Sequence, residues 1–147
     1  MVPNRKEIKM TEGTYDNPTN IRIVQHDVVL QRFKRAYAQE NLSCAQTSNT
    51  LWFANDVACA ALVRVTPIKY RIKATLTLPE YRGLGYGGAM LIVLVDSAIM
   101  IANREGSKSV IVESFARNPK WYLDNGFTVH RVTQWGVTVV RQEITWP

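Results

Sequence analysis

The stretch RGLGYGG, which begins at Arg82, places an arginine beside four glycines in a spacing that suits phosphate binding. Glycine lets the backbone approach a ligand closely, and the first N–H groups of a helix carry a partial positive charge. If a strand enters this turn and a helix leaves it, several N–H groups converge on one point. The alternative is a tight loop without a ligand. The glycines are Gly83, Gly85, Gly87 and Gly88.

Two common nucleotide-binding motifs do not fit this stretch. A P-loop requires GxxxxGK[ST], and no Lys-Ser or Lys-Thr pair follows these glycines. A dinucleotide-binding fingerprint requires GxGxxG after the first strand of a parallel unit. Here the spacing differs, and the turn comes in the middle of the chain, after segments with hairpin signals.

The segments around the glycines predict the elements that would position them. Residues 70–78 alternate like a strand, and an apolar helix is expected from about Gly88 to Arg104, ended by Gly106. Residues 109–114 read as a short strand. Residues 118–125 can form one or two helical turns, with Pro119 near their start and Gly126 at their end.

The remaining segments predict a mixed sheet with helices packed on it. Residues 26–41 carry apolar side chains at helical spacing, and Asp27 is the expected N-cap. Asn55 and Asp56 stand between two apolar runs and predict a hairpin. The expected strands of these regions are residues 21–24, 50–54, 57–65, 127–132 and 136–144.

Composition indicates one globular domain, residues 20–147, behind a polar N-terminal arm, residues 1–19. The 147 residues are 46% hydrophobic and 20% charged, with a net charge of +6, which suits an anionic ligand such as nucleic acid, a phosphorylated cofactor or a membrane surface. Two cysteines without a Cys/His cluster argue against a metal site. The N-terminus lacks a signal-peptide pattern, and the longest apolar run, Ala89 to Val95, is far short of a membrane span. We therefore expect a cytoplasmic protein.

Two elements together resemble the GNAT family of N-acetyltransferases. Arg82, Gly85 and Gly87 match the acetyl-CoA loop pattern R/Q-x-x-G-x-G/A, and Tyr122 stands in WYLDNGF, which is similar to the family's Tyr-x-x-x-Gly-Phe element. The resemblance covers residues 70–130 best. It implies an α/β (α+β) fold with a mixed, mostly antiparallel sheet of six to seven strands flanked by helices. It also implies a V-shaped splay between the fourth and fifth strands.

The resemblance also implies roles for residues of this chain. Loop amides would hold the CoA pyrophosphate, the preceding strand would pair with the pantetheine, and Tyr122 would protonate the departing thiolate. Asn118 stands near the position of a family asparagine that Phe115 replaces here. The implied cofactor-binding residues are Leu76, Thr77, Leu78, Arg82, Gly83, Leu84, Gly85, Tyr86, Gly87, Gly88 and Asn118.

The general base is left open by the sequence. Some family members carry a glutamate twelve residues before the tyrosine, and Val110 occupies that position here. Glu113 is near it but has the opposite strand parity, so it should point to the other face of the sheet. The candidates are Glu113, Glu80, His130 or a water chain; the alternative is an acceptor amine with a low pKa.

The resemblance favours an acyl-CoA-dependent N-acyltransferase that moves an acetyl or similar group from CoA to an amine. A first alternative is an enzyme of this fold that modifies a DNA base or tRNA, because the basic charge and exposed-looking aromatics suit nucleic acid. A second is a catalytically silent CoA-binding regulator. The expected partners are acyl-CoA and an amine acceptor, with no membrane, in a monomer or homodimer.

Overall fold

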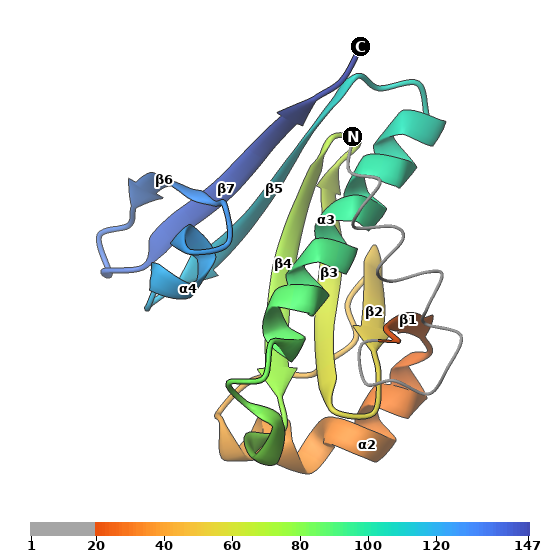
Figure 1. The fold of residues 1–147 in the computed structure, drawn as a ribbon, viewed down its shortest axis with the longest axis vertical. Coiled ribbons are helices and arrows are strands. Elements are labelled where there is room, and N and C mark those ends of the chain that lie inside the picture. Colours follow the sequence, from red (N-terminus) through yellow and green to blue (C-terminus); the bar gives the residue numbers. More distant parts are fainter. Residues whose placement is uncertain (1–19) are drawn as a thin grey trace.

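In the computed structural model, residues 20–147 are described and form a seven-stranded mixed sheet with helices on both faces (Figure 1). The predicted polar arm, residues 1–19, lies outside the described residues. The strand order is β1-β2-β3-β4-β5-β7-β6. The elements are β1 (Arg22–Val24), α2 (His26–Gln39), β2 (Thr50–Ala54), β3 (Ala58–Thr66), β4 (Lys69–Thr77), η3 (Pro79–Tyr81), α3 (Tyr86–Arg104), β5 (Ser109–Ala116), α4 (Lys120–Leu123), β6 (Thr128–Val132) and β7 (Thr138–Thr145).

The predicted hairpin between β2 and β3 is confirmed, and Asn55 closes it. The Asn55 side-chain oxygen accepts hydrogen bonds from the backbone N–H groups of Val57 at 2.9 Å and Ala58 at 2.8 Å. An asparagine side chain that bonds the backbone two and three residues ahead stabilises a turn. This hairpin fixes the register of two central strands, so it supports the strand β4 that borders the candidate site.

Two helix starts differ from the sequence expectation. Asp27 is not the N-cap of α2, because Gln25 takes the extended backbone conformation and the helix begins at His26. Asp27 instead lies in the first turn, where a carboxylate faces the positive end of the helix dipole. Helix α3 begins at Tyr86, two residues earlier than predicted, because Gly85 adopts a left-handed conformation with φ of 93° and directs the chain straight into the helix.

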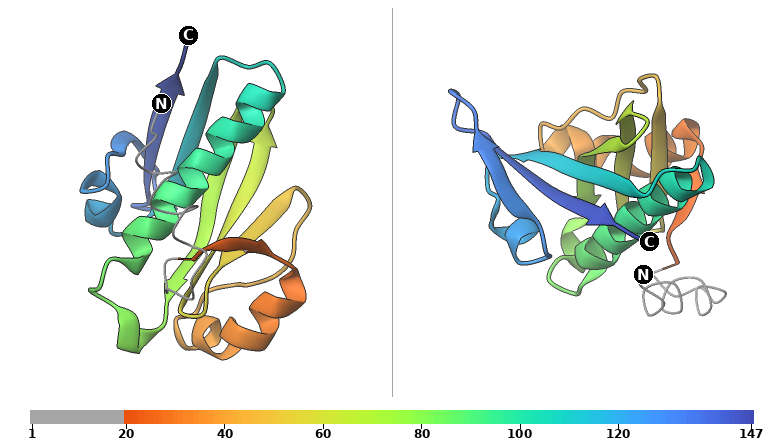
Figure 2. Two further views of the ribbon diagram at one scale, coloured as in Figure 1. Left: turned by 45° about the vertical axis from the view of Figure 1, so that its right-hand side comes forward. Right: turned by 90° about the horizontal axis from the view of Figure 1, so that it is seen from above.

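Helices α2 and α3 cover opposite faces of the sheet (Figure 2). Helix α3 is long and apolar enough to cross a membrane by length and composition alone. The sequence pattern does not predict this, because its longest apolar run, from Ala89 to Val95, is shorter. In this fold it is the main core helix, and its Met90, Leu94 and Ala98 are fully buried against the sheet. Helix α2 buries Val29 and Phe33 in a smaller cluster on the other face.

The predicted splay between β4 and β5 is confirmed. These two strands pair in parallel only where residues 69–71 meet residues 111–113, and beyond that point they separate (Figure 1). The other described strand pairs are antiparallel. Near its end β4 also carries a bulge, since the register with β3 shifts between Cys59 and Ala61, and Ala74 takes a positive φ of 55°. The splay and the bulge leave backbone groups of β4 without a strand partner.

Candidate functional site

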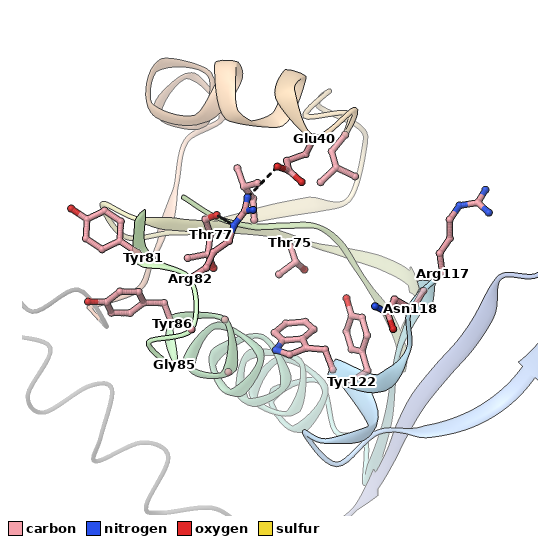
Figure 3. Close-up of a pocket in the computed structure, with 17 residues that line it drawn as sticks. Glu40, Thr75, Thr77, Tyr81, Arg82, Gly85, Tyr86, Arg117, Asn118 and Tyr122 are labelled. Carbon is pink, nitrogen blue, oxygen red and sulfur yellow. Dashed lines mark hydrogen bonds and ion pairs between the residues drawn. The ribbon is translucent and has the colours of Figure 1, made fainter. Parts of the chain in front are cut away.

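A cavity of about 840 Å³ lies at the open end of the splay (Figure 3). Its walls come from the end of β4, the glycine loop, the start of α3, the end of β5 and α4, while the end of α2 closes one side. Elements far apart in the sequence thus meet at one place. The lining residues are Glu40, Leu42, Thr75, Leu76, Thr77, Tyr81, Arg82, Gly83, Gly85, Tyr86, Gly87, Gly88, Ala116, Arg117, Asn118, Trp121 and Tyr122.

The glycines of the loop serve two different physical requirements. Gly83 and Gly85 have positive φ values of 79° and 93°, which residues with a Cβ rarely adopt, and open space surrounds the place where a Cβ would stand. Gly87 has an ordinary φ, but a Cβ there would lie 2.9 Å from a ring carbon of Trp121. The first two glycines shape the turn, and Gly87 lets α4 pack against the start of α3.

The backbone N–H groups of residues 83–88 donate hydrogen bonds to no other described residue. The first helical hydrogen bond of α3 runs from the Ala89 N–H to the Gly85 carbonyl at 3.1 Å, so the amides before it are left over. No side chain caps this helix end. Six consecutive amides without an acceptor among the described residues thus lead into the positive end of the 19-residue helix α3, an arrangement that favours an anion.

Arg82 holds the loop in place as well as adding charge to its rim. Its Nε donates a hydrogen bond to the Thr77 carbonyl at 3.0 Å, and one Nη pairs with the Glu40 carboxylate at 3.2 Å (Figure 3). The guanidinium therefore links the end of β4 to the end of α2. Both side chains are nearly half exposed, so the pair contributes mainly geometry.

Tyr122 reaches the cavity from α4, and its hydroxyl contacts β5. The Tyr122 and Ser114 oxygens are 3.0 Å apart, and the Ser114 hydroxyl lies 3.2 Å from the Ile72 carbonyl. A carbonyl can only accept, so the Ser114 hydroxyl donates its single proton to Ile72. The hydrogen bond between Ser114 and Tyr122 then uses the Tyr122 proton. The Tyr122 ring is held by edge contacts with Trp121 and Phe127, whose centroids lie 4.9 and 5.4 Å away.

The β4 bulge places a further polar group in the cavity. The Thr75 hydroxyl is buried and has no hydrogen-bond partner among the described residues. The bulge beside it is braced from α2, because the Tyr37 hydroxyl donates a 2.5 Å hydrogen bond to the Ala74 carbonyl. Burial raises the pKa of that tyrosine, so it stays a protonated donor. A buried hydroxyl without a partner implies that something else completes its hydrogen bonding.

The structure brings together most of the residues that the sequence singles out. Leu76, Thr77, Arg82, Gly83, Gly85, Tyr86, Gly87, Gly88, Asn118 and Tyr122 all line the cavity. Leu78, Leu84 and Glu113 do not line it. Thr75, Ser114 and Trp121 were not singled out as site residues. The strand alternation that predicts β4 and β5 contains Thr75 and Ser114, but gives no sign that they face a ligand.

Glu113 lies on the other face of the sheet, as its strand parity predicts, and three cations surround it. Arg71 donates to its carboxylate at 3.0 and 2.7 Å, while Lys69 and Arg141 lie at 3.4 and 3.6 Å. Burial by itself raises the pKa of this carboxyl, but the Arg71 hydrogen bonds and the charges of Lys69 and Arg71 outweigh it and hold the pKa below its usual value. A carboxylate with a lowered pKa is a poor acceptor of an ammonium proton.

Comparisons with known proteins identify the fold. No family model matches this sequence, and no curated protein matches it. Among solved structures, N-acetylglutamate synthase from Neisseria gonorrhoeae, complexed with coenzyme A and N-acetyl-glutamate, matches with a TM-score of 0.58 and 15% identity over 84% of this chain. The chain spans only about a third of that enzyme, 35% of its length.

Two further solved structures match over more of their own length. The GNAT-family N-acetyltransferase YhbS from Escherichia coli, in complex with CoA, gives a TM-score of 0.53 and 14% identity, covering 84% of this chain and 79% of that one. The GNAT domain of PAT from S. lividans gives 0.56 and 13%, covering 84% and 89%. The chain therefore has the fold of the GNAT N-acetyltransferases.

Proposed function

We propose that this protein is an acyl-CoA-dependent N-acyltransferase that moves an acetyl or similar acyl group from CoA to an amine. The observation that carries the proposal is the row of free amides of residues 83–88, at the start of α3 and beside the splay. Such a nest suits a pyrophosphate, because its N–H groups and the helix dipole stabilise negative charge. The alternative of a tight loop without a ligand leaves these amides and the adjoining cavity without a purpose.

The rest of the cavity fits the remainder of acyl-CoA. The bulged end of β4 offers backbone groups that β5 does not pair, and an extended chain with amide groups can bind there as an additional strand does. The unpartnered Thr75 hydroxyl lies along the same path. The N. gonorrhoeae and E. coli structures with this fold are complexes with coenzyme A, which supports the same ligand here.

In the proposed reaction, the amine nitrogen forms a bond to the thioester carbonyl carbon and the carbon–sulfur bond breaks. The sulfur leaves as a thiolate, and the Tyr122 hydroxyl donates a proton to it. Ser114 and Ile72 hold that hydroxyl at the seam between the two strands until the thiolate forms. General acid catalysis of this kind contributes roughly 10²- to 10⁴-fold in rate.

The amine must also lose a proton, and we propose that water accepts it. Neither Glu80 nor His130 lines the cavity, and the Glu113 carboxylate is held among its three cations. An alkylammonium has a pKa of about 10, so the neutral fraction of such an acceptor rises with pH through the physiological range. The rate at low acceptor concentration should therefore rise with pH.

The experiment that tests the proposal is a thermal-shift titration with CoA and acetyl-CoA. A ligand that binds the folded state raises the melting temperature in proportion to the logarithm of its concentration over Kd. Gly85→Val should abolish the shift, since it disrupts the left-handed turn that aligns the amides.

Gly136→Val is the matched control for that variant. Gly136 also has a positive φ, 79°, with open space around it, but it lies in the turn between β6 and β7. It should lower the basal melting temperature and leave the CoA shift intact. A full CoA shift in Gly85→Val, or none in the wild type, would show the proposal to be wrong.

A further inference from the structure

A second cavity, of about 540 Å³, lies at the splay next to the first. It shares Leu42, Thr75 and Tyr122 with the first cavity, so the two meet at the proposed acid. Apart from Ser43, its remaining lining comes from the two separating strands and includes Arg71 and Lys73 of β4 and Phe115 of β5. No residue of the glycine loop lines this cavity, so a molecule in it can reach Tyr122 without displacing a ligand of the loop.

We propose that this second cavity binds the acceptor, and that the acceptor is a small amine carrying an anionic group, a carboxylate or a phosphate. The inference rests on the proposed function, which makes Tyr122, where the two cavities meet, the general acid. The cavity lining contains two cationic side chains and no acidic one. The anionic group binds Arg71 and Lys73, and the amine lies toward Thr75 and Tyr122.

Arg71 has hydrogen-bonding capacity to spare. Its Nε and Nη2 donate to Glu113, while Nη1 donates to no described residue. The guanidinium is also stacked on the Phe115 ring, with its carbon 4.5 Å from the ring centroid. Because a carboxylate and an aromatic ring already hold this side chain in one orientation, an anion binds it with little further loss of side-chain freedom.

The surrounding charges leave the cavity positive. Glu113 is shared by Lys69, Arg71 and Arg141, so one carboxylate does not neutralise the three cations. Arg141 also pairs with the exposed Glu143. Lys73 is exposed and forms no ion pair with a described residue, which adds a further positive charge beside Arg71. An anion in this position makes charge-assisted hydrogen bonds, which are stronger than those between neutral groups.

The strand register keeps the two ends of the cavity close. Arg71 is level with Glu113 in the parallel pairing, and the next residue of β5 is Ser114, whose hydroxyl lies 3.0 Å from that of Tyr122. Arg71 and Tyr122 both line this cavity, so an acceptor held at Arg71 lies in the space that Tyr122 borders.

The test uses CoA-loaded protein and sets of acceptors that differ only in the anionic group. Each set contains an amino acid, its amide and its aminophosphonate analogue, with glycine, alanine and β-alanine as the parent compounds. Binding is followed by NMR titration of the labelled protein, and turnover with acetyl-CoA by release of free thiol. At least one anionic member should bind at least tenfold more tightly than its amide, and preference within the set distinguishes carboxylate from phosphonate.

Variants then assign the preference to the cavity. Lys73→Gln should reduce the ratio between anionic member and amide by about fivefold or more, with little change for the amide itself. Lys69→Gln is the matched control, because it removes the same charge from the same face of β4 at a position that does not line the cavity. It should keep the ratio.

Two outcomes overturn the inference. In one, no anionic member binds more tightly than its amide. In the other, Lys73→Gln and Lys69→Gln change the ratio equally, which indicates a general field effect. Failure of the proposed function is separate, since it is read from the absence of a CoA-induced thermal shift before any acceptor is added.

Discussion

The Tyr122 hydroxyl lies 3.0 Å from the Ser114 hydroxyl, which in turn lies 3.2 Å from the Ile72 carbonyl. We predict that Tyr122→Phe lowers kcat about tenfold or more, because the ring and its packing stay while the proton is lost. The CoA-induced thermal shift should stay within error of the wild type. Steady-state kinetics with an active acceptor measures the first effect.

An unchanged kcat in Tyr122→Phe would make this tyrosine a packing residue. The Trp121 and Phe127 contacts would then be its main role. CoA binding by the wild type without turnover of any amine would instead favour the catalytically silent regulator.

The buried Glu113 carboxylate of β5 forms ion pairs with Lys69 and Arg71 of β4 and with Arg141 of β7. We predict that Glu113→Gln destabilises the fold by about 1–3 kcal/mol at pH 7, because the charge-assisted hydrogen bonds from Arg71 are lost while the partly exposed cations keep access to water. The folded-state pKa of Glu113 is lowered, so its stabilising contribution is present above its unfolded pKa and is lost as pH falls through the folded value.

Urea unfolding at pH 7 and near pH 3 checks this prediction. The difference between wild type and Glu113→Gln should be large at pH 7 and smaller in acid. A difference that is the same at both pH values would mean that the charge of Glu113 does not contribute.

The sequence predicts those site residues whose spacing is fixed within one short motif. Arg82, the glycines and Tyr122 stand at fixed spacings within short segments, and they line one cavity. The partners of Glu113 could not be predicted, because Arg71 lies 42 residues away and only the parallel register brings the two together. Thr75 was missed for a similar reason, since its orientation depends on a bulge that local alternation does not reveal.

Helix α4 packs its Trp121 ring against α3 at Gly87, where a side chain would leave no room. A Cβ at Gly87 would lie 2.9 Å from a ring carbon of Trp121, so Gly87→Ala forces that ring, which also contacts Tyr122, to move. We predict a destabilisation of about 1–3 kcal/mol, as for overpacked positions, together with weaker CoA binding. Thermal unfolding with and without CoA measures both.

The neighbouring position provides the control for Gly87→Ala. A Cβ at Gly88 meets only the Asn125 side-chain oxygen, at an ordinary 3.5 Å. Gly88→Ala should therefore be neutral or stabilise the fold by up to about 1 kcal/mol through the lower entropy of the unfolded chain. If the two variants behave alike, contact with Trp121 is not the reason for Gly87.

The order of elements follows from sequence patterns, whereas their ends depend on capping geometry. The Asn55 turn and the strand alternation predict β2, β3 and β4 within one or two residues. The start of α3 was placed two residues late, because the left-handed Gly85 lets Tyr86 and Gly87 belong to the helix. Asp27 has a residue type that favours a cap, but the extended Gln25 is the N-cap and the helix begins at His26.

The net charge of +6 is compatible with nucleic acid as the acceptor. Arg32, Lys34 and Arg35 are exposed on α2, although Arg32 already pairs with Asp56 at 3.4 Å. We predict no DNA or tRNA binding that persists at physiological salt. Contacts to phosphates release counterions, so such binding weakens steeply as salt rises, whereas CoA binding through backbone amides should respond far less.

Fluorescence anisotropy with labelled DNA and tRNA, run beside CoA titrations, tests this prediction. Charge reversal of the three α2 residues serves as the comparison variant. If the wild type binds tightly at physiological salt and this variant does not, an enzyme that modifies nucleic acid is favoured over one that acts on a small amine.

The short seam between β4 and β5 also has a consequence for how the chain folds. Strands β1 to β4 each pair with the next strand in sequence, whereas β5 pairs with β7 and β7 pairs with β6. The two groups pair with each other only through residues 69–71 and 111–113. Pairing across a long loop is slow to form because closing the loop costs entropy. We expect each group of strands to assemble around α3 before the seam closes. The reaction centre would then be the last part of the molecule to form and the first to open.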